Sequence, residues 1–181
     1  MSRISQVVVL AEDRRHQRFV RYYLKRLYGA IPTTRFVDLP SGRGSGEQWV
    51  RDHYALEVQA FRSRSTRAST ALIVLIDSDR GEIDGRVRQL RDALFQAHFQ
   101  PRADPEKIVH LIPKRNLETW VLCLGGRAVD EQDDYSREEG IDAEIPAAAR
   151  TFFEWSRLRS SVPAHCVPSL RAAFPEARRL E

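Results

Sequence analysis

Two short runs of consecutive apolar residues constrain the fold of this chain more than any other feature of its sequence. The first, Val-Val-Val-Leu, lies in residues 4–11, and the second, Ala-Leu-Ile-Val-Leu-Ile, fills residues 71–76. Both runs are rich in β-branched residues and neither alternates with polar ones, which is typical of strands buried on two faces. Such strands occur in parallel sheets that helices cover on both sides, so the runs predict an α/β protein.

Helical patterns alternate with the strand candidates along the chain. Residues 14–28 carry one apolar face and are followed by Gly29, as expected at the end of a helix. This alternation predicts a mainly parallel, Rossmann-like sheet with helices on both faces. The expected strands are residues 4–11, 33–39, 71–76 and 107–112, and the expected helices are residues 14–28, 47–64, about 83–97 and 117–124.

The chain is long enough for one full domain with its own core and too short for a second large one. We expect a catalytic domain in residues 1–126, an acidic loop or linker in residues 127–145, and a helical C-terminal extension in residues 146–181. The extension is expected to form one or two helices that dock through apolar side chains. These side chains are Phe152, Phe153, Trp155 and Leu158.

Several classes of protein are excluded by composition. The N-terminus is polar, and the sequence has no signal peptide and no apolar run of about 18 residues that would cross a bilayer. Cys123 and Cys166 are too few for a disulfide scaffold, which indicates a reduced, cytoplasmic protein without a membrane partner. The five histidines are scattered, and no spacing among them suggests a zinc site.

The basic residues are almost all arginine, since only three of the 29 are lysine. Arginine pairs with phosphate in two places at once, which suits contact with nucleic acid, although a GC-rich genome also favours arginine codons. The acidic residues are concentrated, with eight of the 25 between Asp130 and Glu144. The rest of the chain therefore carries a positive surplus that favours a polyanionic partner, DNA or RNA.

Acidic residues follow three of the expected strands. Glu12 and Asp13 come after the first, Asp77 and Asp79 after the third, and Glu118 after the fourth. The carboxyl ends of parallel strands meet at one edge of a sheet, where ligands collect near the point at which strand order reverses. Carboxylates gathered there repel one another unless a cation lies among them, and their hard oxygen atoms favour Mg²⁺ or Mn²⁺.

This arrangement resembles the Toprim domain, which occurs in primases, topoisomerases and OLD-family nucleases. The resemblance rests on a glutamate after the first strand, an Asp-x-Asp motif after a later strand, and a basic-to-acidic motif after the next one. Residues 112–120, Ile-Pro-Lys-Arg-Asn-Leu-Glu-Thr-Trp, look most like the short stand-alone Toprim proteins related to OLD nucleases. The likeness covers about residues 4–124 and implies a Toprim-like fold.

The resemblance also implies roles for individual residues. Glu12 would be a metal ligand or general base, Asp77 and Asp79 the paired ligands, Glu118 the later acid, and Lys114 the residue that steadies the scissile phosphate. The catalytic set is then Glu12, Lys114 and Glu118. The chain departs from the family in one place: Asp13 stands where a glycine usually follows the first glutamate, and Asp13 is itself a substitute ligand candidate. Nucleic-acid contacts are expected from Arg14, Arg15, Arg43 and Arg115.

The function expected from these features is Mg²⁺- or Mn²⁺-dependent hydrolysis of phosphodiester bonds in DNA or RNA. A tyrosine domain or primase module would not fit in so short a chain, which favours a nuclease, as the effector of a defence system with a separate ATPase partner. One alternative is a non-catalytic Toprim-like subunit that binds nucleic acid or regulates such a partner, and a homodimer also remains open. A second alternative is a receiver-like domain with Asp77 as phosphoacceptor, although Lys114 follows Pro113 rather than preceding a proline.

Overall fold

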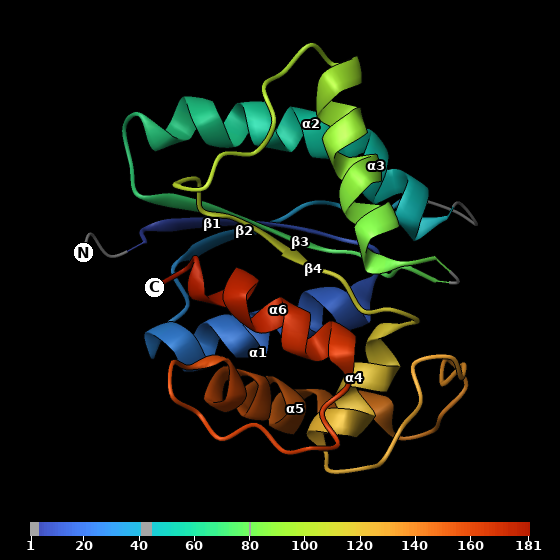
Figure 1. The fold of residues 1–181 in the computed structure, drawn as a ribbon. Coiled ribbons are helices and arrows are strands. Elements are labelled where there is room, and N and C mark those ends of the chain that lie inside the picture. The colour runs from blue at the N-terminus through green and yellow to red at the C-terminus, as the bar shows by residue number, and fades with distance from the viewer. Residues whose placement is uncertain (1–3, 41–44, 80) are drawn as a thin grey trace.

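The protein is an α/β domain built on one parallel sheet, as the computed structural model describes it for residues 4–40, 45–79 and 81–181 (Figure 1). The sheet has the strand order β2-β1-β3-β4, and every neighbouring pair is parallel. This confirms the predicted fold class. The strands are β1 (Gln6–Ala11), β2 (Thr33–Phe36), β3 (Thr70–Leu75) and β4 (Ile108–Leu111).

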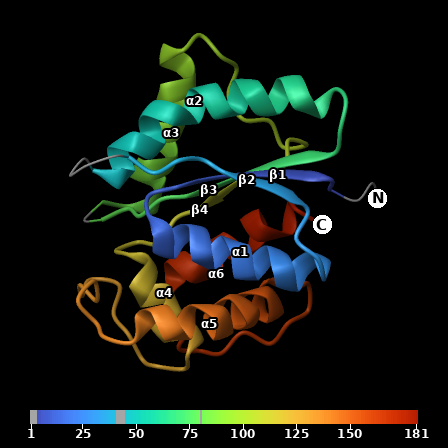
Figure 2. The same ribbon diagram turned by 180° about the vertical axis from the view of Figure 1, so that it is seen from behind.

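Helices cover both faces of the sheet (Figures 1 and 2). One face is covered by α2 and α3, and the other by α1, α4 and α6. Helix α5 packs against α1, α4 and α6 on the side away from the sheet. The helices are α1 (Arg14–Tyr28), α2 (Gly46–Ser65), α3 (Ile83–Gln96), α4 (Leu117–Leu124), α5 (Ile141–Ser156) and α6 (Pro168–Arg178).

The two central strands explain the continuous apolar runs. Alternate residues of β3 enter opposite cores: Ile73 packs with α1, α4, α5 and α6, whereas Leu72 packs with α2 and α3. Strand β1 divides its residues in the same way, with Val9 in the first core and Leu10 in the second. Edge strand β2 alternates between exposed and half-buried residues, which accounts for its weaker pattern in the sequence.

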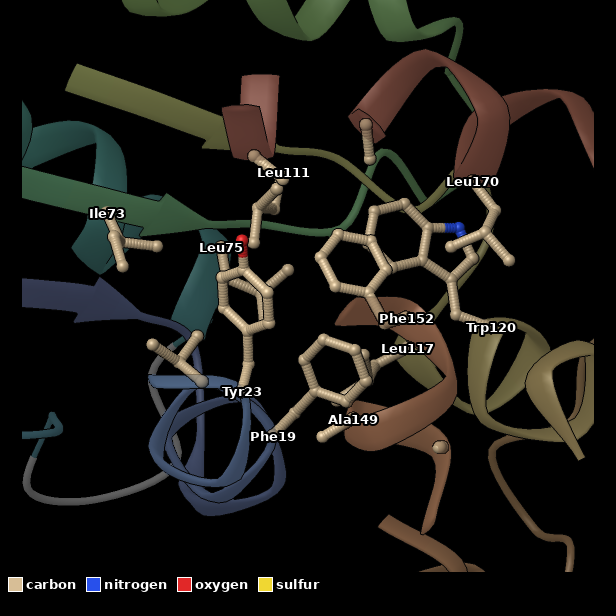
Figure 3. Packing of buried hydrophobic residues seen from close by; sticks show 14 of the residues in the cluster. Phe19, Tyr23, Ile73, Leu75, Leu111, Leu117, Trp120, Ala149, Phe152 and Leu170 are labelled. Carbon is tan, nitrogen blue, oxygen red and sulfur yellow. The ribbon is translucent and has the colours of Figure 1, made fainter. Parts of the chain in front are cut away.

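Aromatic side chains join the C-terminal helices to the sheet-covering helices (Figure 3). The ring of Phe152 on α5 lies edge-on to Phe19 at 5.5 Å and to Tyr23 at 5.1 Å, both on α1. The same ring stacks on Trp120 of α4 at 6.0 Å and tilts toward Phe174 of α6 at 5.7 Å. Residues beyond 126 therefore complete the core that the sheet begins.

The other apolar residues expected to dock the extension are less buried than Phe152. Phe153 and Trp155 are partly buried against the same core, whereas Leu158 is exposed. Helix α5 begins at Ile141, inside the segment expected to be a linker, because acidic residues in its first turn suit the positive end of a helix. Before it, Glu131 accepts a hydrogen bond from the Ser169 amide at 2.9 Å, which attaches the loop that precedes α5 to α6.

The open edge of β4 is closed by an ion pair. Glu176 of α6 accepts the outward amide of His110, and Arg102 donates to the outward carbonyl of Ile108 at 2.9 Å. Arg102 and Glu176 also pair with each other at 2.5 Å. Covering an edge in this way prevents another strand from pairing with it. None of the helices in the described part of the chain has the length and apolar character needed to span a membrane.

Candidate metal centre

The strand order reverses between β1 and β3. The chain leaves β1 toward β2 on one side and later adds β4 beyond β3 on the other. Crevices in open parallel sheets form at such a point, outside the carboxyl ends of the strands. Glu12 directly follows β1 and Asp77 lies just beyond β3, so both reach this crevice.

Glu12, His16 and Asp77 form a compact cluster there. One potential ligand atom from each lies within 4.8 Å of the others. Nε2 of His16 is 3.0 Å from Oδ1 of Asp77, and the Asp77 amide donates to Oε1 of Glu12 at 2.6 Å. His16 and Asp77 are buried, and Glu12 is half-buried. The two strand ends and the first turn of α1 therefore converge on one point.

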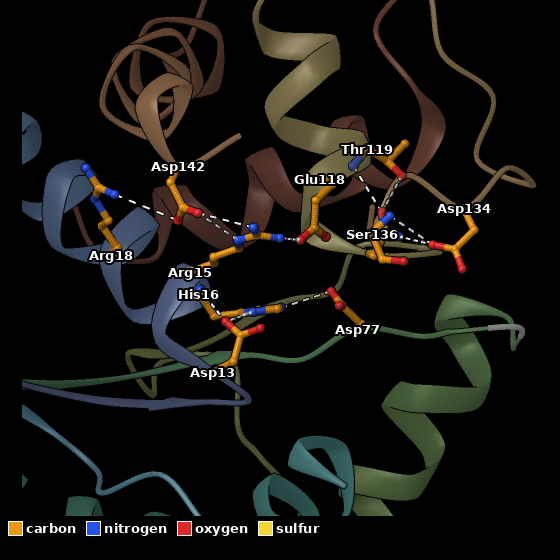
Figure 4. A network of polar contacts seen from close by, with 11 residues as sticks. Asp13, Arg15, His16, Arg18, Asp77, Glu118, Thr119, Asp134, Ser136 and Asp142 are labelled. Atoms are coloured by element: carbon orange, nitrogen blue, oxygen red, sulfur yellow. Dashed lines mark hydrogen bonds and ion pairs between the residues drawn. The ribbon is translucent and has the colours of Figure 1, made fainter. Parts of the chain in front are cut away.

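Asp13 fixes the orientation of His16 (Figure 4). As the N-cap of α1, Asp13 accepts the His16 amide through Oδ1 at 2.9 Å. The same oxygen lies 2.7 Å from Nδ1 of the His16 ring. With Nδ1–H donating to Asp13, the opposite ring nitrogen, Nε2, points to Asp77. A carboxylate behind a histidine in this way orients and strengthens a metal-binding imidazole.

The pKa values of the cluster show how closely its charges are packed. Burial, and then the charge of Asp77, raises the pKa of Glu12 to about 8. Burial alone would lower the pKa of His16, but the charge of Asp77 and the hydrogen bond to Asp13 raise it well above its usual value. Burial raises the pKa of Asp77 as well, so the cluster as a whole disfavours uncompensated negative charge.

A divalent cation suits this donor set. It would neutralise the two carboxylates, and it needs a neutral imidazole nitrogen as its third ligand. Three protein ligands leave further coordination positions for water or substrate on the open side of the cluster. Glu12, His16 and Asp77 therefore fit a single metal ion.

A cavity opens above Asp77, and the other two predicted ligands line it. Asp79 is exposed and has a left-handed backbone with φ of 54°, and its Oδ2 lies 3.5 Å from buried Arg86. Glu118 accepts from Arg15 at 2.6 Å. The structure thus brings Asp79 and Glu118 to the cavity wall, on arginine partners, rather than into the Glu12–His16–Asp77 cluster, although Glu118 is itself buried. The cavity is lined by Asp13, Asp77, Asp79, Arg115, Asn116, Glu118, Asp134 and Ser136.

The predicted basic residues occupy different places around the site. Arg14 and Arg15 line a second hollow together with Glu12, and Asp13 lines both hollows, so the two adjoin. Arg115 lines the first cavity. Nζ of Lys114 lies 3.4 Å from Oε1 of Glu82. Arg43 lies outside the described residues.

Gly46 allows the start of α2 to lie close to the backbone of Glu12. A Cβ atom at this position would lie 2.6 Å from the carbonyl oxygen of Glu12, closer than Cβ atoms come to such an atom in real structures. The first residue of α2 thus rests against the backbone of Glu12. Asp13, the N-cap of α1, occupies the position directly after Glu12. The glycine that lies beside the Glu12 backbone comes instead from the start of α2.

His16 and Arg86 are the residues that the sequence analysis did not assign to the site. The scattered histidines gave no ligand spacing, because the partners of His16 come from two other elements. One local signal was present: an aspartate three residues before a histidine at the start of a helix places a cap against the imidazole. Arg86 is buried beside Glu47 and Asp79. Nothing in the sequence distinguishes it from the other arginines in helices.

Comparison with known proteins gives no relative from which to transfer a function. No family model matches the sequence, and neither the curated proteins nor the solved structures compared with it give a match. The fold and the site define the class: an α/β protein with a candidate metal centre at the switch point of a parallel sheet.

Proposed function

We propose that this protein is a divalent-metal-dependent phosphodiesterase that acts on DNA or RNA, with a Toprim-like arrangement of acids. The observation that carries the proposal is the Glu12–His16–Asp77 cluster, whose ligand atoms lie within 4.8 Å of one another at the switch point. Acidic clusters at this place on an α/β sheet are suited to hold a metal beside a phosphate. The arginines around the cluster supply charge for the rest of a polyanion.

The donor set favours Mn²⁺ over Mg²⁺ as the bound ion. Mg²⁺ binds through oxygen ligands and rarely takes imidazole, whereas Mn²⁺ tolerates mixed oxygen and nitrogen ligands. Glu12 and Asp77 would supply the oxygens and His16 the nitrogen. When bound, the ion would act as a Lewis acid on a phosphate and lower the pKa of a coordinated water.

The remaining residues have roles that follow from their positions. Asp13 holds the His16 ring, and Arg15 holds Glu118 at the cavity wall. Glu118 and Asp79 both line the cavity above Asp77, where they can accept a proton or bind a second ion. Arg115 lines the same cavity and can contact a phosphate oxygen.

A linear substrate suits the shape of the site better than a small compact one. The two hollows adjoin at Asp13, so together they extend across the carboxyl edge of the sheet. Arg14 and Arg15 lie in one hollow and Arg115 in the other. A phosphodiester chain lying across Asp13 would meet basic side chains on both sides of the metal cluster.

The proposal is tested by incubating the purified protein with plasmid, linear DNA and RNA in the presence of Mn²⁺ or Mg²⁺. We expect cleavage that requires metal, is faster with Mn²⁺, and falls at least about 100-fold in Asp77→Asn. Asp104→Asn is the matched control, because Asp104 is an exposed loop residue outside the cluster. Both variants should retain the circular dichroism spectrum of the wild type.

Two results would count against the proposal. One is a wild-type protein that cleaves none of the three substrates with either metal. The other is cleavage that Asp77→Asn and Asp104→Asn reduce equally, since the activity would then not depend on the cluster.

A non-catalytic nucleic-acid-binding subunit is the second candidate. The observation that favours it is the pairing of Arg15 with Glu118 and of Arg86 with Asp79, which engages two of the predicted acids with the protein's own cations. In the same assay, this candidate predicts salt-dependent binding of nucleic acid without cleavage. The receiver-like alternative has less support, because Asp77 is buried on His16 and Lys114 is engaged with Glu82.

A further inference from the structure

The acidic segment identified in the sequence lies beside the arginines of the candidate site. We use the name acidic segment for residues 130–144, which include the first turn of α5. Two of its carboxylates, Asp134 and Asp142, reach toward the metal centre (Figure 4). Asp142 contacts Arg15 and Arg18 of α1, the helix that bears His16. Asp134 contacts Arg115 in the loop before α4, the helix that bears Glu118.

Asp142 bridges two arginines of α1. Its Oδ2 accepts from Nε and Nη2 of Arg15 at 3.3 and 3.1 Å, and its Oδ1 lies 3.8 Å from Arg18. Arg15 also donates to Glu118. Both hydrogen bonds from Arg15 end on one oxygen of Asp142, and a planar guanidinium can donate the same pair of bonds to a phosphate.

Asp134 forms a similar contact on the other side of the cavity. Its Oδ2 lies 3.4 Å from Nη2 of Arg115, and its Oδ1 accepts from the Asn116 side chain at 3.0 Å and from the Ser136 amide at 2.9 Å. Asp134 and Ser136 both line the cavity above Asp77. The acidic segment therefore forms part of the wall that a substrate would meet.

These ion pairs are weak enough to be exchanged. The side chains of Asp134 and Asp142 are 51% and 56% exposed, and ion pairs of such exposed groups contribute little to stability. A nucleic acid offers several phosphates at once and releases counterions on binding, which gives it the advantage over two separate carboxylates. The arginines can then turn from carboxylate to phosphate without a change of fold.

We infer that Asp134 and Asp142 are internal competitors for the phosphate-binding arginines, so that the acidic segment weakens binding of nucleic acid at this face. The inference rests on the proposed function for the identity of the polyanion. It adds that the face of Arg15, Arg18 and Arg115 is an interaction surface for a phosphate backbone. In this structure the chain's own carboxylates are seated on that surface.

The test compares the double variant Asp134→Asn/Asp142→Asn with the control Asp133→Asn/Glu139→Gln. Both remove two negative charges from the same segment, but neither Asp133 nor Glu139 is paired with an arginine among the described residues. Binding is measured by fluorescence anisotropy with a labelled 20-nucleotide DNA of mixed sequence, single- or double-stranded. EDTA is present throughout, so cleavage does not enter the measurement.

The test variant should bind the DNA about three- to tenfold more tightly than the control variant at low salt, because two competing pairs are removed. Equal affinities for the two variants would overturn the inference. If neither variant nor the wild type binds either DNA, the inference is overturned, and so is a DNA substrate for the site. Tighter binding by the test variant without cleavage in the metal assay would leave the inference standing and the nuclease proposal wrong.

A mutant cycle separates local competition from a general change of charge. Arg115→Gln should weaken binding, and Asp134→Asn should strengthen it only while Arg115 is present. In the Arg115→Gln background we therefore expect Asp134→Asn to change the affinity less than about twofold. A full gain from Asp134→Asn in that background would show that Asp134 acts through bulk charge, which contradicts the inference.

Discussion

His16 links the helix α1 to the candidate metal centre through two carboxylates. Its Nδ1 faces Asp13 and its Nε2 faces Asp77, so the ring cannot turn without losing a hydrogen bond on each side. A ring held in this way presents one nitrogen to a metal at little entropic cost. The role of Asp13 can therefore be separated experimentally from that of the ligands.

The variant Asp13→Asn keeps an N-cap oxygen but removes the charge behind the imidazole. We expect Mn²⁺ affinity to fall about 10- to 100-fold, the range typical for loss of a carboxylate that supports a ligand histidine. Isothermal titration calorimetry measures the change, with Asp38→Asn as a control on an exposed residue. An unchanged affinity would mean that His16 does not bind the ion.

His110 provides a pH dependence away from the metal centre. Burial, and then the charges of Arg102 and Arg179, lowers the pKa of His110 well below 6.5, and its Nε2 lies 2.9 Å from the Tyr54 hydroxyl. Below about pH 6.5 the unfolded chain gains a proton on His110 that the folded protein does not. The free energy of unfolding should then fall by up to about 1.4 kcal/mol per pH unit from this residue.

Urea unfolding of the wild type and His110→Gln at about pH 7.5 and about pH 5 tests this. Glutamine can still accept from Tyr54 but does not titrate. The wild type should be the more stable protein at the higher pH, and this advantage should shrink at the lower one. An advantage that grows on acidification would contradict a neutral, buried His110.

Residue types at strand ends predicted part of the site. Glu12 and Asp77 follow the two strands with the clearest apolar runs, so their meeting at one edge followed from the parallel sheet. His16 could not be found in the same way, because its position depends on the rotation of α1 about its axis. Asp79 and Glu118 reach the cavity, but the arginines that contact them come from other elements, which a sequence pattern does not reveal.

At the scale of elements, the start of α2 controls how closely Glu12 is held. Gly46→Ala should destabilise the protein by about 1–3 kcal/mol and weaken Mn²⁺ binding, because the new methyl group would overlap the Glu12 carbonyl. Gly85→Ala is the matched control in α3, where the nearest atom is 3.8 Å away. That change should be neutral or stabilising by up to about 1 kcal/mol.

Thermal unfolding and metal titration of both variants give the comparison. If Gly46→Ala binds Mn²⁺ as the wild type does, the close approach of α2 has no bearing on the centre.

Element boundaries were predicted best where local signals were strong. Helix α1 runs from Arg14 to Tyr28 as expected, because an aspartate caps its start and Gly29 follows its end. Strand β2 is shorter than the expected residues 33–39, since only Thr33 to Phe36 pair with β1. The start of α5 was missed because acidic residues favour both a loop and the first turn of a helix.

The whole molecule depends on the C-terminal helices for its core. Phe152→Ala should lower the free energy of unfolding by about 3–5 kcal/mol, because its ring lies against aromatic residues of three other helices. Phe95→Ala is the control, with a side chain that is 79% exposed. Its effect should be below about 0.5 kcal/mol.

Both variants should unfold in one transition when followed by circular dichroism and by tryptophan fluorescence. The contrary result would be that Phe152→Ala abolishes a separate unfolding transition of the C-terminal helices and leaves the unfolding of the sheet unchanged. That result would support an independent domain in residues 1–126.

The sequence predicted the class of fold because continuous apolar strands require cover on two faces. It did not predict that α5 would complete the core on the far side of α1 and α6. That arrangement depends on the fit of Phe152 among rings from three helices, and such packing has no periodic signal. The contact of the acidic segment with the arginines of the site is likewise a property of the assembled molecule.

If the proposed function is right, Glu12, His16 and Asp77 bind one metal ion. The most direct measurement is an anomalous difference map from a crystal of the protein grown with Mn²⁺. We expect one strong peak about 2.0–2.4 Å from a carboxylate oxygen of Glu12, Nε2 of His16 and a carboxylate oxygen of Asp77. A map with no peak at these three residues, or with its only peak on Asp79 and Glu118, would contradict it.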